Sequence, residues 1–147
     1  MTQNKINSKW PSVTETDLDA VEQKIKRKLP RSLREFYLKT NGGRPEKDIF
    51  INEDDEYGVQ EILPVIYGGP GTNFEETYED LVTSRALIPA DLIPFAVNGG
   101  GDYYCINDEG RVFFVAMDPP DDPPVLVADS IDEFINGMVS EEDLGWV

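Results

Sequence analysis

The apolar residues near the start of the chain recur at helical spacing. Thr14 stands before them as an N-cap residue, and Asp17 follows it at the spacing of a capping box. Because proline cannot continue a helix, the pattern predicts a helix that starts after Thr14 and ends before Pro30. Its buried stripe is expected to be Leu18, Val21, Ile25 and Leu29, with Lys24, Lys26, Arg27 and Lys28 in the last turns, where cations complement the helix dipole.

A second helix is predicted directly after Pro30, with Leu33, Phe36 and Tyr37 as its buried face. The run Asn41-Gly42-Gly43 follows it. Asparagine and glycine readily take the left-handed conformation that ends helices. Two short helices are therefore expected to open the domain.

Beyond residue 48 the apolar residues gather in short runs typical of strands. The turn Asp108-Glu109-Gly110 predicts an antiparallel hairpin between two of these runs. The acidic segment from Asn52 to Gly58 is predicted to be a loop. The expected strands are Ile49–Ile51, Val59–Ile66, Ile93–Val97, Tyr103–Asn107, Arg111–Ala116 and Val125–Ala128.

Two further helices complete the pattern. Asn73 is expected to cap a middle helix, and Ser130 with Glu133 forms a second capping-box sequence before a C-terminal helix. The order of elements predicts an α+β fold around a mostly antiparallel sheet, with two N-terminal helices, a middle helix and a C-terminal helix. The apolar positions are Phe74, Tyr78, Leu81 and Val82 in the middle helix, and Ile131, Phe134, Ile135 and Met138 in the last.

The amino-acid composition excludes most common types of enzyme active site. The 147 residues include no histidine, which excludes Ser-His-Asp and Cys-His nucleophiles and every histidine-bearing metal site. The single cysteine, Cys105, excludes an internal disulfide and lacks a histidine to activate it, so we expect a small packed apolar residue. The polar N-terminus has no apolar segment of a secretion signal, and we expect a soluble cytoplasmic protein.

Charge is distributed very unevenly over the chain, whose net charge is −16. Residues 1–47 carry eleven cations against six acids, whereas residues 48–147 carry two cations against twenty-three acids. Nucleic acids and anionic membranes bind through cationic side chains, so both are disfavoured as ligands. A basic protein partner is favoured, although an acidic surface can also serve solubility alone.

The sequence lacks the specific features of three further kinds of site. The acidic run at Asn52–Glu56 lacks the turning glycine and the bidentate glutamate of a calcium loop. Gly99-Gly100-Gly101 lacks the third glycine of a dinucleotide fingerprint and precedes a strand, so we expect a tight bend where backbones approach closely. A carboxylate-dependent glycoside hydrolase stays open as a third hypothesis, without specific support. We predict no catalytic residue, no metal and no cofactor.

The ordered motifs resemble the SUKH superfamily, specifically its Smi/Knr-type domains. The resemblance begins with Leu29-Pro30, the aromatic-Leu pair Tyr37-Leu38 and Asn41-Gly42-Gly43. It continues through three later motifs in the same order and covers roughly residues 14–139 of a single domain spanning 1–147, with short extensions at both ends. The later motifs are Ile93-Pro94-Phe95-Ala96 with Gly99–Asp102, Tyr104–Ile106 with Gly110–Phe113, and Val127–Phe134.

The resemblance implies a non-enzymatic α+β domain of the kind found in bacterial immunity proteins. Such a protein neutralises a cognate toxin, here expected to be a basic nuclease-type toxin, by stoichiometric occlusion through an acidic surface. A regulatory interaction scaffold of the cell-wall signalling type is the alternative. We expect a monomer or weak homodimer. The predicted contacts, on loops or a polar helix face, are Asp54, Asp55 and Glu56, then Glu75, Glu76, Glu79 and Asp80, then Asp118, Asp121 and Asp122.

Overall fold

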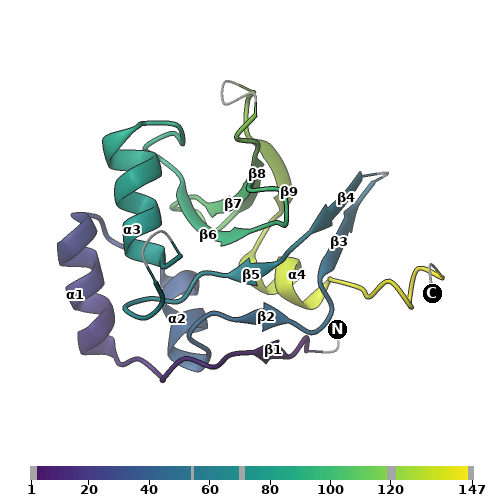
Figure 1. Cartoon of the computed structure of the whole chain (residues 1–147), viewed down its shortest axis with the longest axis horizontal. Helices are drawn as coiled ribbons and strands as arrows, with labels where there is room; N and C mark the ends of the chain where they lie inside the picture. The colour runs from purple at the N-terminus through teal and green to yellow at the C-terminus, as the bar shows by residue number, and fades with distance from the viewer. Residues whose placement is uncertain (1–2, 54, 70–71, 119–121, 146–147) are drawn as a thin grey trace.

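A five-stranded antiparallel sheet is the frame of the computed structural model, which describes residues 3–53, 55–69, 72–118 and 122–145 (Figure 1). The strand order is β5-β6-β7-β8-β9, so β5 and β9 are its edges. These strands are β5 (Glu61–Ile62), β6 (Ile93–Val97), β7 (Tyr103–Ile106), β8 (Val112–Val115) and β9 (Val125–Ala128). The predicted α+β fold with a mostly antiparallel sheet is confirmed.

Two small antiparallel pairs accompany the sheet. One joins β1 (Ile6–Asn7) to β2 (Arg44–Pro45), and the other is the hairpin of β3 (Ile49–Asn52) and β4 (Asp55–Gly58). The sequence did not predict β1, and β4 occupies part of the segment predicted to be an acidic loop. Since glutamate and aspartate are poor strand formers, β4 is held by its pairing with β3 rather than by local propensity.

The first helix, α1 (Glu15–Ile25), begins as predicted, with both bonds of the Thr14–Asp17 capping box present. It ends earlier than predicted, because Lys26 adopts a left-handed conformation with φ of 59°. Leu29 is still buried, but it lies in the connection to α2 (Arg31–Lys39). The basic residues at 26–28 are therefore outside the helix.

The predicted strand Val59–Ile66 is also shorter than expected. Its pairing with β6 is limited to β5 and one flanking bond on each side, from Gln60 N to the carbonyl of Val97 and from Leu63 N to the carbonyl of Phe95. Pro64 has no N–H to continue the pairing, and Ile66 takes φ of 71°, which a strand does not allow. The chain therefore turns away from the sheet two residues after β5.

The middle helix α3 (Phe74–Tyr78) is capped by the Asn73 side chain as predicted, and it continues as a π-helix over Glu79–Ser84. The last helix, α4 (Ile131–Asn136), is capped by Ser130, whose Oγ accepts from Glu133 N at 3.0 Å. The predicted hairpin of β7 and β8 is confirmed, with Gly110 at φ of 84° in its turn. The glycine bend before β7 is closed by Asn98 Oδ1, which accepts from Gly100 N and Asp102 N.

Helices cover both faces of the sheet. On one side, α3 packs against β6 and against α1, which lies beside it in Figure 1. On the other, the Phe134 ring of α4 lies 6.2 Å from that of Phe95 and 5.1 Å from that of Tyr104, between ring centroids. Phe50 of β3 reaches the same ring at 5.3 Å, which anchors the β3–β4 hairpin to the core.

Candidate partner-binding surfaces

The three predicted acidic groups lie on different parts of the fold. Figure 1 shows α3 on one side of the five-stranded sheet and the β3–β4 hairpin on the other. Asp118 and Asp122 belong to the connection from β8 to β9. Asp54 and Asp121 lie outside the described residues. The α3 group therefore lies apart from the hairpin group, and each group is considered by its own surroundings.

The prediction that Glu75 lies on the polar face of its helix is wrong, because this residue of α3 has a buried side chain. Both of its carboxylate oxygens accept from Ile66 N, at 3.0 and 2.9 Å. Burial raises the pKa of the Glu75 carboxyl above its ordinary value, although the bond from Ile66 acts in the opposite direction. The carboxylate holds the turn at Ile66 and is not available to a partner.

The other acids of this group are used largely inside the protein. Glu79 lies 3.9 Å from Lys24 Nζ on α1, and Asp80 forms two bonds with the Arg85 guanidinium, at 3.0 and 2.8 Å. Glu76 is half-buried, and its backbone N–H donates to the Asn73 cap. This group contributes more to the docking of α3 than to an open acidic surface.

The hairpin group is more accessible. Asp55 and Glu56 are exposed on β4, where they stand opposite Asn52 and Ile51 of β3. Successive strand residues face opposite ways, so Asp55 shares a face with Tyr57, and Glu56 shares the other face with Ile51. Neither carboxylate belongs to an ion pair in the described part of the chain.

The group in the β8–β9 connection is also accessible to a partner. Asp118 and Asp122 are exposed, and neither takes part in an ion pair among the residues described. The segments 48–58 and 112–128 contain no lysine or arginine. The negative charge of these two groups is therefore not compensated by their own neighbours in sequence.

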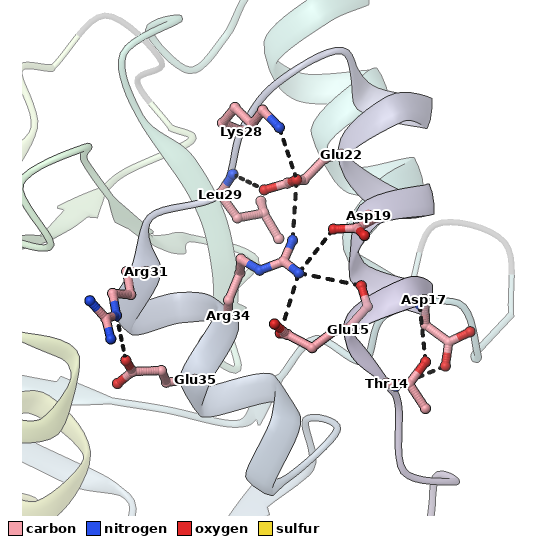
Figure 2. A network of polar contacts seen from close by, with 10 residues as sticks. All are labelled: Thr14, Glu15, Asp17, Asp19, Glu22, Lys28, Leu29, Arg31, Arg34 and Glu35. Carbon is pink, nitrogen blue, oxygen red and sulfur yellow. Dashed lines mark hydrogen bonds and ion pairs between the residues drawn. The ribbon is translucent and has the colours of Figure 1, made fainter.

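Most cations of the first two helices and of the connection between them form ion pairs inside the protein, as Figure 2 shows for Arg34. Its guanidinium lies 3.3 Å from Glu15, 3.0 Å from Asp19 and 3.1 Å from Glu22 on α1. Glu22 is buried and also accepts from Leu29 N at 2.8 Å. The network ties α2 and the 26–30 connection to α1.

Arg27 makes the longest-range of these contacts. It donates to the carbonyls of Ala90 and Asp91 and to the carboxylate of Asp108, at 3.1 Å for the last. Lys24, Arg27 and Arg34 thus each pair with an acid of another element or loop. These three cations therefore join separate parts of the fold.

Cys105 is buried as predicted, and burial raises the pKa of its thiol well above the ordinary value. Among the described residues, no three Cys, Asp or Glu side chains come together in a way that could hold a metal ion. Within the same residues, no helix is both long and apolar enough to cross a bilayer.

The sequence did not reveal a network of buried hydrogen bonds around the turn after β5. Tyr37 donates its hydroxyl to the Leu63 carbonyl at 2.6 Å, while Asn41 accepts from Val65 N at 2.8 Å and donates to the Val65 carbonyl at 3.1 Å. Together with Glu75 they fix residues 63–66. The only sequence signal was the position of Asn41 before two glycines, which indicated a helix end rather than a buried contact.

The sequence also did not single out two exposed apolar residues of the edge strand β9. Val125 is 46% exposed and Leu126 is 41% exposed. An apolar run directly after two prolines suggests an edge strand, and that was the available signal.

Comparison with known proteins gives a family and a fold. The family model described as SMI1 / KNR4 family (SUKH-1) matches residues 12–137. No curated protein matches the chain at a significant level. A crystal structure of a protein from Pseudomonas syringae pv. tomato is similar in fold, with a TM-score of 0.53 and 23% sequence identity over 78% of this chain and 75% of that chain.

Proposed function

This chain belongs to the SMI1/KNR4 family (SUKH-1), and we propose that it is an immunity protein that neutralises a cognate toxin by binding it. The family includes immunity proteins of polymorphic toxin systems. Within the proposal, the toxin is a basic, nuclease-type protein, and the inhibitor covers its active cleft without chemistry of its own.

The distribution of paired and unpaired charge is the observation that carries this proposal. The basic residues of the first two helices are neutralised mainly by neighbouring acids, whereas Asp55, Glu56, Asp118 and Asp122 are exposed and outside the ion pairs of the described residues. A nuclease attracts phosphate with cations. A surface of free carboxylates complements such a cleft and speeds encounter by electrostatic steering.

The buried thiol supports a binding role over catalysis. A nucleophile must reach its substrate as a thiolate, and Cys105 is both enclosed and held in its protonated form. Inhibition by occlusion then requires one inhibitor molecule for each toxin molecule.

Co-expression with the protein encoded by the adjacent gene tests the proposal, with cell survival as the readout. We expect cells that produce the adjacent gene product to survive only when this protein is produced as well, and titration of the purified toxin should reach full inhibition at equimolar protein. Protection at far lower amounts would indicate catalysis and contradict occlusion. An adjacent gene product that is harmless alone yet binds this chain would favour a regulatory scaffold.

A further inference from the structure

The β3–β4 hairpin and the edge of the main sheet enclose an apolar surface that faces solvent. The Tyr57 ring on β4 lies 5.4 Å from the Phe114 ring on β8, between centroids. Phe114 is paired across the strands with Val125, which is 46% exposed. We call these three side chains the hairpin–edge surface.

Hydrogen bonds and ring contacts hold the hairpin–edge surface in place. Asn52 donates to the carbonyls of Leu126 and Val127, at 3.4 and 3.3 Å, and this joins the hairpin to β9. Tyr104 lies 5.4 Å from Phe114 between ring centroids and donates its hydroxyl to the Gly58 carbonyl at 2.7 Å. A partner would therefore meet a preformed surface and would not need to order it.

Two carboxylates act on Tyr57, and two others flank Phe114 and Val125 in the sequence. The charges of Asp55 and Glu53, together with burial as the larger cause, raise the pKa of the Tyr57 hydroxyl, so both carboxylates act on the ring's polar end. Asp118 follows Phe114 by four residues, and Asp122 precedes Val125 by three. Apolar centres with charged rims are typical of protein interfaces, and large exposed apolar side chains are unusual on a sheet edge without a partner.

We propose that the hairpin–edge surface is the docking site for a basic segment of the protein partner, whose arginine or lysine stems lie on Tyr57, Phe114 and Val125. The cationic ends of those side chains would then reach the carboxylates of Asp55 and Glu53, and of Asp118 and Asp122 in the β8–β9 connection. Contacts of this kind combine burial of the hydrocarbon stem, attraction between cation and ring, and charge pairing. The proposal rests on the proposed function only in identifying the partner as the toxin.

Neighbouring residues on opposite strand faces provide matched controls. Leu126 is exposed almost as much as Val125, at 41%, but it pairs with Phe113 and so lies on the other face of the sheet. Glu56 is likewise the neighbour of Asp55 on the other face of the hairpin. In each pair, Val125 with Leu126 and Asp55 with Glu56, the two residues have similar side chains and adjacent positions but lie on opposite faces.

Nuclear magnetic resonance titration with a synthetic peptide of alternating arginine and leucine tests the site without the toxin. We expect saturable amide shifts centred on Tyr57, Phe114 and Val125, and no such shifts with a peptide in which glutamate replaces arginine. Val125→Ser should weaken binding by about fivefold, whereas Leu126→Ser should leave it unchanged. Shifts centred on α3, or equal weakening by both variants, would overturn the proposal.

The toxin assay separates the site from the function. The double variant Val125→Ser with Asp55→Lys should lose neutralisation, and Leu126→Ser with Glu56→Lys should retain it, with amide spectra confirming that both are folded. If both double variants neutralise equally, the site is wrong while the proposed function stands. If the wild type fails to neutralise, the proposed function is wrong, and the peptide titration still decides whether this surface binds cationic segments.

Discussion

Replacing Gly42 by alanine tests whether the Asn41-Gly42-Gly43 motif has a structural role. Gly42 has φ of 68°, and a Cβ atom there would lie 2.6 Å from the Ile62 carbonyl oxygen, 2.8 Å from Pro64 N and 2.9 Å from Leu63 C. All three neighbours are backbone atoms, one at the end of β5 and two in the turn after it. Alanine at this position therefore meets both an unfavourable backbone conformation and a steric clash that no side-chain rotation can relieve.

The two effects can be assigned magnitudes. A left-handed conformation costs an L-residue about 1–2 kcal/mol. Moving the β5 segment away disturbs the pair of bonds between Gly43 and Ile62, which measure 2.9 and 2.8 Å, and each such bond contributes about 1 kcal/mol net. We therefore expect Gly42→Ala to lower the free energy of unfolding by about 3–4 kcal/mol, a large part of the stability of an ordinary domain.

Two glycines of the bend before β7 separate these contributions. Gly101 has φ of 88° but no atom within 4 Å of an added Cβ, so Gly101→Ala isolates the conformational cost of about 1–2 kcal/mol. Gly99 has neither constraint, and Gly99→Ala should cost nothing or stabilise by up to about 1 kcal/mol. The open space at both positions also shows that the predicted close approach of backbones in this bend is wrong.

Urea denaturation of the wild type and the three variants measures the differences, provided that all share one m-value. The expected order of stability is Gly99→Ala, then Gly101→Ala, then Gly42→Ala. If Gly42→Ala costs no more than Gly101→Ala, the turn after β5 relaxes freely and the steric part of the argument is refuted.

Three further predictions concern titration, charge pairing and encounter. Because burial raises the pKa of the Glu75 carboxyl, the folded protein binds that proton more tightly than the unfolded chain does. The wild type should therefore lose stability relative to Glu75→Gln as the pH rises from the ordinary pKa of 4.5 through the raised pKa of the folded state. If urea denaturation gives the two proteins parallel profiles of stability against pH, the prediction is contradicted. Arg34→Met should lower the free energy of unfolding by about 2–4 kcal/mol, because it leaves the buried Glu22 without its main cationic partner. The control Arg31→Met, which removes an exposed pair with Glu35, should change it by less than about 0.5 kcal/mol. Equal shifts in the denaturation midpoint would contradict a structural role for the Arg34–Glu22 pair. Stopped-flow association with the toxin should slow by about tenfold or more between low and physiological salt, and a salt-independent rate would exclude steering by carboxylates.

Features encoded by a few neighbouring residues could be predicted from the sequence. The caps at Thr14, Asn73 and Ser130 each depend on a side chain and a backbone N–H three residues away, and all three are confirmed. The hairpin of β7 and β8 depends on a short turn with glycine, and it is confirmed as well. In these places local chemistry and tertiary packing favour the same conformation.

Features that depend on distant partners could not be predicted in this way. The end of α1 is accompanied by the bond from Leu29 N to Glu22, whose charge is balanced by Arg34 on the next helix. Glu75 stands on the polar side of a helical pattern, yet it is buried because Ile66 N needs an acceptor there. A carboxylate that satisfies a buried donor is indistinguishable, in sequence, from one that faces water.

The same distinction decides which carboxylates a partner can use. At least seven of the thirteen cations form ion pairs within the protein, and most of these pairs involve α1, α2 or the α3 segment. The acids of the β3–β4 hairpin and of the β8–β9 connection come from stretches of sequence without any cation. The pairs between the basic first part of the chain and its acids therefore leave the exposed carboxylates of the hairpin and of the β8–β9 connection outside the ion pairs of the described residues. Under the proposed function, these carboxylates orient an approaching basic protein before contact, and the apolar side chains of the hairpin–edge surface hold it once it arrives.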